Sequence, residues 1–184
     1  MFTRRRLVIT AVTAALVLSA ACRGKHHRTT VENEEPAAAE APPRLASTLK
    51  MSDPAATGQL LKGVYGLEGG GAWRWTAGHF SIALRPPLSA AQRGATLSLA
   101  FTVPEVVIQK LGKITLSASI GATKLKSEPC PKSGAYTFTA DVPAELLTKD
   151  SVTVDFDLDK SLPATPADQR ELGVIVTSAG LESK

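Results

Sequence analysis

Apolar and polar residues alternate along most of the C-terminal two-thirds of the chain. Five runs place apolar side chains at every second position, and they span residues 80–84, 97–103, 114–120, 136–138 and 152–158. Successive side chains of a strand point to opposite faces, so this period is typical of antiparallel strands that pack on one side. A more apolar segment from Leu172 to Leu181 predicts a last strand.

Turn-forming residues separate these runs. They are Arg85-Pro86-Pro87, Arg93-Gly94, Leu111-Gly112-Lys113, Ser133-Gly134 and Leu162-Pro163. Short strands with such separators predict an all-β fold: a jelly-roll-like antiparallel β-sandwich of about eight strands. One helical turn is expected at residues 143–147, with Pro143 at its first position.

The N-terminal segment has the three parts of a signal peptide. Arg4 to Arg6 form a positive region, Leu7 to Leu18 is apolar and uncharged, and Ser19 to Ala21 supplies small residues before a cut. A membrane-spanning helix needs about 20 apolar residues, and this run is shorter. Residues 1–21 are therefore predicted to be a signal peptide.

Cys22 follows the small residues directly. The segment resembles the end of a bacterial lipoprotein signal, whose form is Leu-small-small-Cys, although Ser19 occupies the usual leucine position. Ordinary signal peptidase could cut at the same bond. We expect lipidation of Cys22, which would make the membrane a partner. The protein is then expected in the cell envelope, at the periplasmic face or the outer membrane. An unacylated chain would be secreted. Arg23, which is not aspartate, favours the outer membrane.

Residues 22–58 are predicted to be a tether, and residues 59–184 the folded domain. The stretch 32–43 is rich in Pro, Ala and Glu, and it cannot bury enough surface to offset the entropy of ordering. As a flexible coil, the tether would reach roughly 30–35 Å. That distance holds a domain clear of a membrane surface.

The charge of the mature chain is close to neutral. The full chain has 21 Lys and Arg against 17 Asp and Glu, and cleavage after Ala21 removes three arginines and no acid. Nucleic acid is therefore not an expected partner, because its binding requires a clustered basic face. If Cys22 is acylated, Cys130 has no intramolecular partner; it is interpreted as a small buried residue, with an intermolecular disulfide as the alternative.

Catalytic and cofactor motifs are not found. The sequence has no Gly-x-Ser-x-Gly element, no phosphate-binding loop and no zinc-type Cys and His spacing, so no catalytic residue, cofactor or metal is assigned. Asp155, Asp157 and Asp159 share one face of a predicted strand. A calcium loop would need Gly and Glu where Lys160 and Pro166 stand, so a solvated face is favoured.

Two clusters depart from the alternation. The first runs from Gly63 to Thr76 and contains both tryptophans, and the second runs from Asp168 to Gly173. Together they resemble a small β-sandwich domain, galactose-binding-like in layout, that accompanies bacterial glycosyltransferases and other surface-polysaccharide proteins. The resemblance covers residues 60–182, and the matching positions are Gly63, Tyr65, Glu68, Arg74, Trp75, Thr76, Asp168, Arg170, Leu172 and Gly173. The chain departs from that pattern at Gly121-Ala122, where the family often has Asn-Gly.

Two interpretations of these clusters remain open. The candidate ligand-binding residues are Tyr65, Glu68, Trp73, Arg74, Asp168 and Arg170, because aromatic rings stack on sugars and charged groups bind hydroxyls. The alternative, which is favoured, gives them a structural role in which arginines pair with nearby acids. Alternation places Trp73 and Trp75 on one strand face and Arg74 on the other.

The predicted function is that of a non-catalytic binding module in the bacterial cell envelope, with carbohydrate as the favoured ligand class. The alternative is a structural or protein-interaction component of an envelope assembly, with an envelope protein as partner. A glycan-processing enzyme is a weaker hypothesis. Its conceivable acids are Glu68, Glu105 and Asp168, and the sequence singles out no pair among them.

Overall fold

A computed structural model of the chain describes residues 45–184. Nine strands in this region account for most of the fold: β1 (Thr48–Lys50), β2 (Leu60–Glu68), β3 (Trp73–Leu84), β4 (Ala95–Val103), β5 (Ile114–Ile120), β6 (Thr123–Cys130), β7 (Gly134–Val142), β8 (Val152–Leu158) and β9 (Ile175–Ser183). The helical elements are short: η1 (Pro54–Gln59), α1 (Ala90–Arg93), α2 (Glu105–Leu111) and η2 (Ala144–Leu146). All strand pairs are antiparallel.

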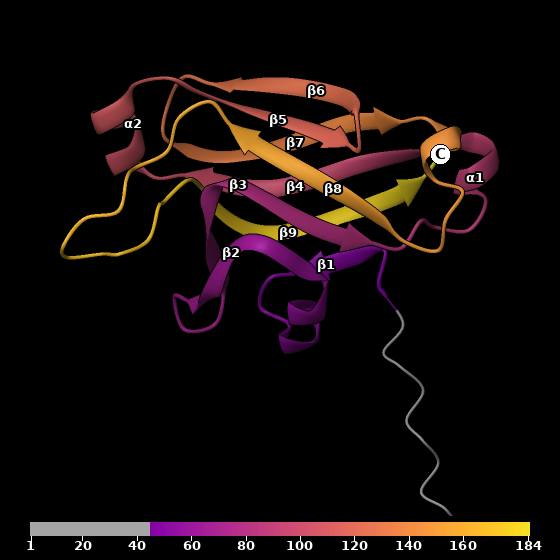
Figure 1. Cartoon of the computed structure of the whole chain (residues 1–184), viewed down its shortest axis with the longest axis horizontal. Helices are drawn as coiled ribbons and strands as arrows, with labels where there is room; N and C mark the ends of the chain where they lie inside the picture. Colours follow the sequence, from indigo (N-terminus) through magenta and orange to yellow (C-terminus); the bar gives the residue numbers. More distant parts are fainter. Residues whose placement is uncertain (1–44) are drawn as a thin grey trace, which may run out of the picture. The chain divides into compact units, whose positions relative to one another are not determined.

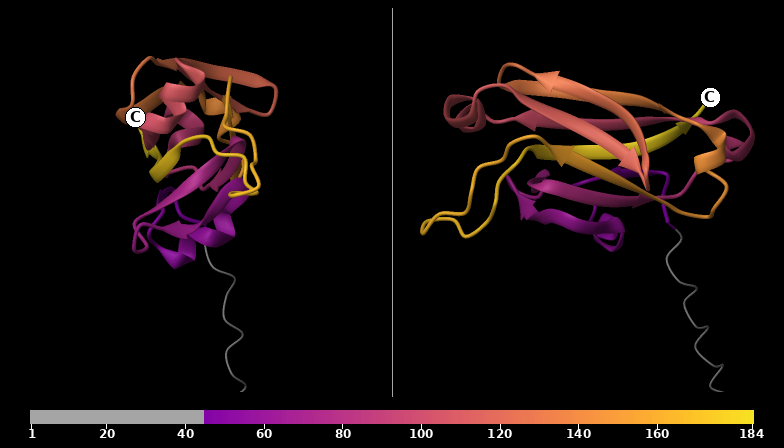
Figure 2. Two further views of the ribbon diagram at one scale, coloured as in Figure 1. Left: turned by 90° about the vertical axis from the view of Figure 1, so that its left-hand side faces the viewer. Right: turned by 45° about the horizontal axis from the view of Figure 1, so that its top comes forward.

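The strands form two layers that are joined where the start of β3 pairs with β9. The hydrogen-bonded order is β6-β5-β8-β3-β9-β4-β7, with β2 added to β3 and β1 added to β9. Residues 79–84 of β3 pair with β8, whereas Arg74 and Trp75 of the same strand pair with β9. One layer is therefore β6-β5-β8-β3-β2 and the other is β7-β4-β9-β1, as Figures 1 and 2 show.

Apolar side chains from both layers meet between them. Phe80 of β3 stacks on Phe156 of β8 with ring centroids 4.9 Å apart, and Phe138 of β7 meets Phe156 edge-on at 6.2 Å. Along β4 every second residue is buried, from Ala95 to Val103. The predicted antiparallel β-sandwich is thus confirmed, and most of the apolar positions that the alternation identified lie in its core.

The folded region begins before the boundary predicted at residue 59. β1 pairs with β9, and both Leu49 and Met51 are buried. The Gln59 side chain accepts from the Ala46 backbone N–H and donates to carbonyls, including that of Ala83 at 2.7 Å. A strand of three residues is too short to show a period, which explains the error. The predicted signal peptide, Cys22 and the rest of the predicted tether lie outside the described residues.

Several other elements were not predicted from the sequence, among them α2 and β6. The helix α2 follows Pro104 and buries Val107 against the end of the sandwich. The strand β6 is an edge strand whose side chains are mostly exposed on both faces, so it lacks an apolar stripe. The helical turn expected after Pro143 is confirmed as η2. Within residues 45–184 we find no helix with the length and apolar character needed to cross a membrane.

Candidate functional site

The first half of β3 turns an arginine toward the core and two tryptophans outward. Arg74 and Thr76 are buried on the same face as Phe80, while Trp73 and Trp75 are half-buried on the other face. The predicted separation of the tryptophans from Arg74 is thus confirmed. Of the two groups, the arginine is the more deeply buried, with 6% of its surface exposed.

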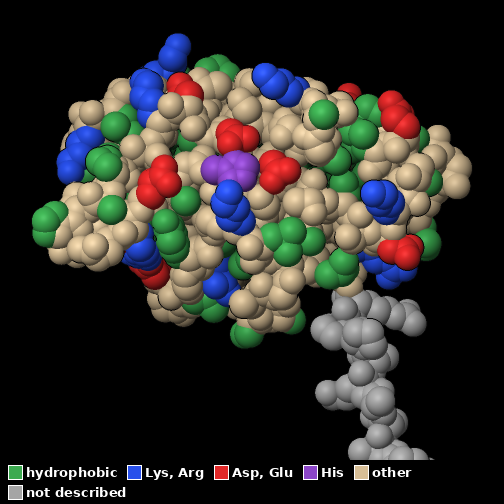
Figure 3. All heavy atoms as spheres, in the orientation of Figure 1, with side chains coloured by type: hydrophobic (Ala, Val, Ile, Leu, Met, Phe, Trp, Pro, Cys, Tyr) green, Lys and Arg blue, Asp and Glu red, His purple; other side chains and the backbone are tan. Residues whose placement is uncertain are grey.

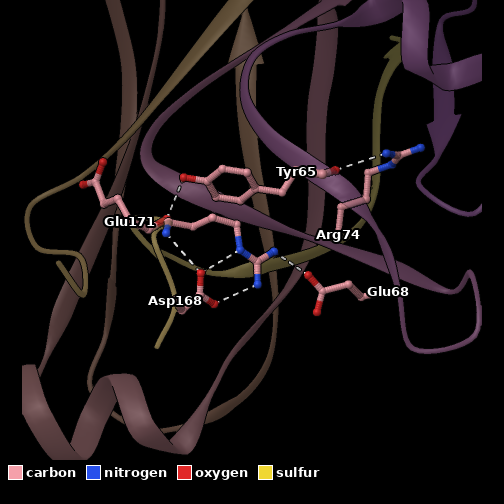
Figure 4. Close-up of polar contacts among 6 residues, drawn as sticks. Tyr65, Glu68, Arg74, Asp168 and Glu171 are labelled. Carbon is pink, nitrogen blue, oxygen red and sulfur yellow. Dashed lines mark hydrogen bonds and ion pairs between the residues drawn. The ribbon is translucent and has the colours of Figure 1, made fainter. Parts of the chain in front are cut away.

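Arg74 binds the segments that lie beside β3. Its Nε donates to the Met51 carbonyl at 3.2 Å, and its Nη1 donates to the Tyr65 carbonyl at 3.1 Å. Its Nη2 donates to the Thr57 hydroxyl at 3.2 Å. Figure 4 shows the Arg74 guanidinium pointing away from the other charged candidates. These contacts hold η1 and β2 against β3, which is a structural role.

Arg170 is the centre of the polar cluster. It forms a two-point contact with Asp168, from Nε to Oδ1 at 3.0 Å and from Nη2 to Oδ2 at 2.9 Å, and its Nη1 lies 2.5 Å from Glu68 Oε1. The guanidinium carbon lies 5.2 Å from the centre of the Tyr65 ring. The Tyr65 hydroxyl donates to the Glu171 carbonyl at 2.8 Å (Figure 4). Four of the six candidates therefore converge.

These contacts shift the acidities of the cluster. The hydrogen bonds from Arg170 lower the pKa of Asp168, and the two carboxylates raise the pKa of the Arg170 guanidinium. Burial, followed by the negative charge of Glu171, raises the pKa of the Tyr65 hydroxyl. At neutral pH the cluster therefore consists of an ionised Asp168, a charged Arg170 and a neutral phenol.

Several positions that resemble the surface-polysaccharide family, among them Gly63, Thr76 and Gly173, lie in close backbone contact along one line of the fold, which we call the seam. The Thr76 hydroxyl accepts from the Val174 N–H at 3.2 Å, and the Gly173 N–H donates to the Thr76 carbonyl at 2.7 Å. Gly63 has φ +65°, and a Cβ there would lie 2.0 Å from the His79 carbonyl oxygen. The seam therefore joins β2 and β3 to the segment that precedes β9, and it supports the structural interpretation for most of these residues.

A pocket of about 320 Å³ adjoins the cluster at the end of the sandwich where α2 lies. One wall is α2, and the other is the connection between β8 and β9 (residues 159–174, the β8–β9 connection), which extends beyond the sheets in Figures 1 and 2. The pocket is lined by Trp75, Val106, Lys110, Leu111, Leu162, Pro163, Thr165, Asp168, Arg170 and Leu172. It thus combines an aromatic ring and aliphatic side chains with a few polar groups.

The two walls of the pocket are tied together. Lys160 Nζ donates to the Leu111 carbonyl at 3.1 Å and to the Lys113 carbonyl at 2.7 Å, which links the β8–β9 connection to the end of α2. Leu162 and Leu172 pair through backbone hydrogen bonds in both directions. The walls are therefore held in place without a ligand, as in most small-molecule sites.

The structure divides the sequence-predicted candidates among different roles. Asp168 and Arg170 line the pocket, while Tyr65 and Glu68 contact Arg170 outside the lining. Trp73 meets Trp75 edge-on with ring centroids 6.5 Å apart and is not part of the lining. Trp75 and Lys110 were missed as candidates. Trp75 matches the family pattern but was assigned no ligand-binding role, and α2, which carries Lys110, gave no motif in the sequence.

A second polar group covers the outer face of β3 and β8. His79 Nδ1 lies 2.6 Å from Asp157 Oδ1, and the Ser81 hydroxyl donates to Asp155 at 2.6 Å. Figure 3 shows His79, which is the one histidine among residues 45–184, between acidic side chains. Because Ser81 binds an aspartate and not the imidazole, the described residues form no pair of nucleophile and base here. No cluster able to hold a metal ion is found in residues 45–184.

Another pocket lies at the opposite end of β8. It is larger, about 510 Å³, and it is formed by the β5–β6 turn, η2 and the start of β8. Its lining contains Ile120, Leu146 and Val152 but no aromatic side chain. The pocket beside Trp75 is therefore the stronger candidate for recognition of a ligand with an apolar face.

Comparisons with known proteins show weak structural likeness. No family model and no curated protein matches the sequence. Among solved structures, the chain is similar to TmCBM27, a carbohydrate-binding module studied for specific mannan recognition, with a TM-score of 0.44 and 10% identity over 76% of this chain and 97% of that chain.

Two further structures show the same level of likeness. One is BtGH115A, a family GH115 4-O-methyl-α-glucuronidase with specificity for decorated arabinogalactans, with a TM-score of 0.40 and 10% identity over 78% of this chain and 18% of that chain. The other is a CBM4 structure, with a TM-score of 0.36 and 11% identity over 74% and 85%. Likeness this weak gives no information on ligand or activity, and the expected membership in the surface-polysaccharide family stays a prediction.

Proposed function

We propose that residues 45–184 form a non-catalytic glycan-binding module and that the pocket beside Trp75 is its binding site. The observation that carries this proposal is the lining of that pocket, where an aromatic ring lies beside Asp168 and Arg170. The C–H face of a pyranose ring packs on an aromatic ring, while its hydroxyls need paired donors and acceptors. The charged pair next to Trp75 offers both.

The state of Asp168 supports the non-catalytic part of the proposal, because it argues against a general acid at this position. A glycosidase acid must hold its proton near neutral pH, which requires a raised pKa. The pKa of Asp168 is lowered, because both of its oxygens accept hydrogen bonds from Arg170. Glu68 is bound to the same guanidinium. Asp168 and Glu68 are therefore arranged to hold Arg170.

The proposal includes the delivery of the module. Export follows from the signal-peptide pattern of residues 1–21, and anchoring to the cell envelope follows from acylation of Cys22. Mass spectrometry of the mature N-terminus tests this part. A first residue Cys22 carrying acyl chains is the expected result, whereas an unmodified Cys22 would restrict the proposal to a secreted module.

The binding site is tested by tryptophan fluorescence. The chain contains two tryptophans, so Trp73→Phe leaves Trp75 as the only indole in the protein. We expect its emission to change on titration with a glycan from a panel of cello-, manno-, xylo- and galacto-oligosaccharides and their 6-carboxylated forms. Calorimetry with the same glycan should show that Trp75→Ala weakens binding by at least about tenfold, which corresponds to about 1.4 kcal/mol.

Matched variants distinguish the loss of the Trp75 ring from a general loss of structure. Trp75→Phe keeps an aromatic surface and should retain most of the affinity. Trp73→Ala removes an equal side chain from the same strand face but outside the pocket lining, and it should bind as the parent does. Equal affinity in Trp75→Ala and the parent, or a response to none of the glycans, contradicts the proposed site.

A further inference from the structure

We infer that the sugar bound at this pocket carries a carboxylate, so that the ligand class is an acidic glycan containing uronic acid. This inference rests on the proposed function and adds the charge of the ligand. It depends on three charged lining residues, which are Lys110, Asp168 and Arg170.

The unpaired charge of the lining is positive. Lys110 and Arg170 each contribute one positive charge, and Asp168 contributes one negative charge. Glu68 binds Arg170 from outside the lining and brings the sum of these four charges to zero, so Lys110 is the charged group that the cluster leaves without a partner. Lys110 lies in the last turn of α2, is exposed to solvent and takes part in none of the ion pairs formed within residues 45–184. Its ammonium is therefore available to an anion.

The hydrogen-bonding groups of the lining also favour an anionic ligand. A guanidinium has five N–H donors, and Arg170 uses three of them on Asp168 and Glu68, so two remain. The Lys110 ammonium adds three donors. The oxygens of Asp168 accept two contacts from the Arg170 side chain and a third from its backbone N–H at 3.0 Å. Among these three charged side chains, donors thus outnumber free acceptors.

A donor-rich pocket next to an aromatic ring favours one kind of sugar. Neutral sugars present hydroxyls, which both donate and accept, and they leave such a lining only partly satisfied. A uronate presents two acceptor oxygens with a negative charge while keeping the pyranose face that packs on a ring. Charge-assisted hydrogen bonds are about twice as strong as neutral ones, so the carboxylate adds affinity as well as selectivity.

The test uses glycan pairs that differ only in the group at C6. The pairs are tetragalacturonate and its methyl ester, cello-oligosaccharides and their C6-oxidised forms, and mannuronate and mannose oligomers. We expect the acidic member of at least one pair to bind at least about tenfold more tightly than its neutral partner, which corresponds to about 1.4 kcal/mol. Raising the salt concentration should reduce this preference, because exposed charges are screened.

Lysine variants assign the preference to the pocket. Lys110→Gln should weaken binding of the acidic member severalfold more than binding of its neutral partner. Lys113→Gln removes a charge three residues away and outside the lining, so it should keep the preference. Equal or tighter binding of the neutral member in every pair that binds overturns the inference. So does an equal preference in Lys110→Gln and the parent protein.

The outcomes also distinguish this inference from the proposed function. If neutral glycans change the fluorescence of Trp75 and Trp75→Ala removes their binding, the glycan site stands and the acidic ligand class is wrong. If neither member of any pair binds, both are wrong.

Discussion

Replacing Arg74 by methionine tests whether the most buried arginine serves the fold or a ligand. Methionine keeps much of the length and apolar volume of the stem while removing all three hydrogen bonds to Met51, Thr57 and Tyr65. If Arg74 is structural, the change destabilises the domain. If Arg74 serves a ligand, stability should change little.

The magnitude follows from the surroundings of the three acceptors. The contact with the Met51 carbonyl is buried, and losing a charged donor there costs about 2 kcal/mol. The contacts with Tyr65 and Thr57 are partly buried, so water replaces some of the lost bonding and each costs about 0.5 kcal/mol. The free energy of unfolding should therefore fall by about 3 kcal/mol. For a domain of this size, that lowers the Tm by about 10 °C.

Urea and thermal unfolding followed by circular dichroism measure this loss. Hydrogen exchange should show the largest loss of protection in residues 45–59, because Arg74 attaches that segment to β3. Arg93→Met is the matched control: Arg93 is exposed, its guanidinium binds the Ser89 hydroxyl, and its loss should cost less than about 0.5 kcal/mol. A loss in Arg74→Met no larger than in Arg93→Met would refute the structural role.

Three further predictions concern single residues. Gly63→Ala should lower the free energy of unfolding, measured by urea titration, by at least about 2 kcal/mol, because Gly63 has a positive φ and an added Cβ would lie 2.0 Å from a backbone oxygen. The control Gly66→Ala has open space around it and should be close to neutral. Burial, with smaller contributions from nearby acids, raises the pKa of Cys130 to about 11 from its ordinary 9.0. The folded thiol should therefore resist disulfide reagents at pH 8, and the free energy of unfolding should fall as the pH rises from 9 towards 11; rapid labelling of the native protein would contradict this. The lowered pKa of Asp168 stabilises the fold above the ordinary carboxyl range, and this contribution should disappear as acid protonates the group, so Asp168→Asn should have a flatter stability profile below pH 4 than the parent.

The sandwich could be predicted because its core strands are buried on one side. The runs around Phe80, Leu99 and Phe156 carry an unbroken period of two, and each lies in the core. The elements missed lack that pattern. β1 has three residues, β6 is exposed on both faces, and the apolar face of α2 covers the end of the sandwich through one fully buried residue, Val107.

The site was only partly predictable, because its residues meet through long-range contacts. The two sequence clusters and their resemblance to a surface-polysaccharide family marked six candidates: Tyr65, Glu68, Trp73, Arg74, Asp168 and Arg170. The structure brings four of them together and leaves out Trp73 and Arg74. Nothing local shows that Arg74 turns inward while Trp75 lines a pocket, since either face of an isolated strand can be the buried one. Only the position of Phe80 in the core, six residues later in the same strand, shows which face is buried, and Arg74 lies on that face.

The position of β9 sets the moment at which the domain can fold during synthesis. This strand is the last in the sequence, yet it lies between β3 and β4 and also carries β1 on its edge. Until residues 175–183 have been made, the chain has two partial sheets with open edges and no strand to join them. The sandwich can therefore close only after residues 175–183 have been made, and its folding rate is limited by contacts between distant parts of the sequence. In a chain that we propose is exported, this order keeps the polypeptide unfolded, and so able to pass through a membrane channel, until residues 175–183 are available.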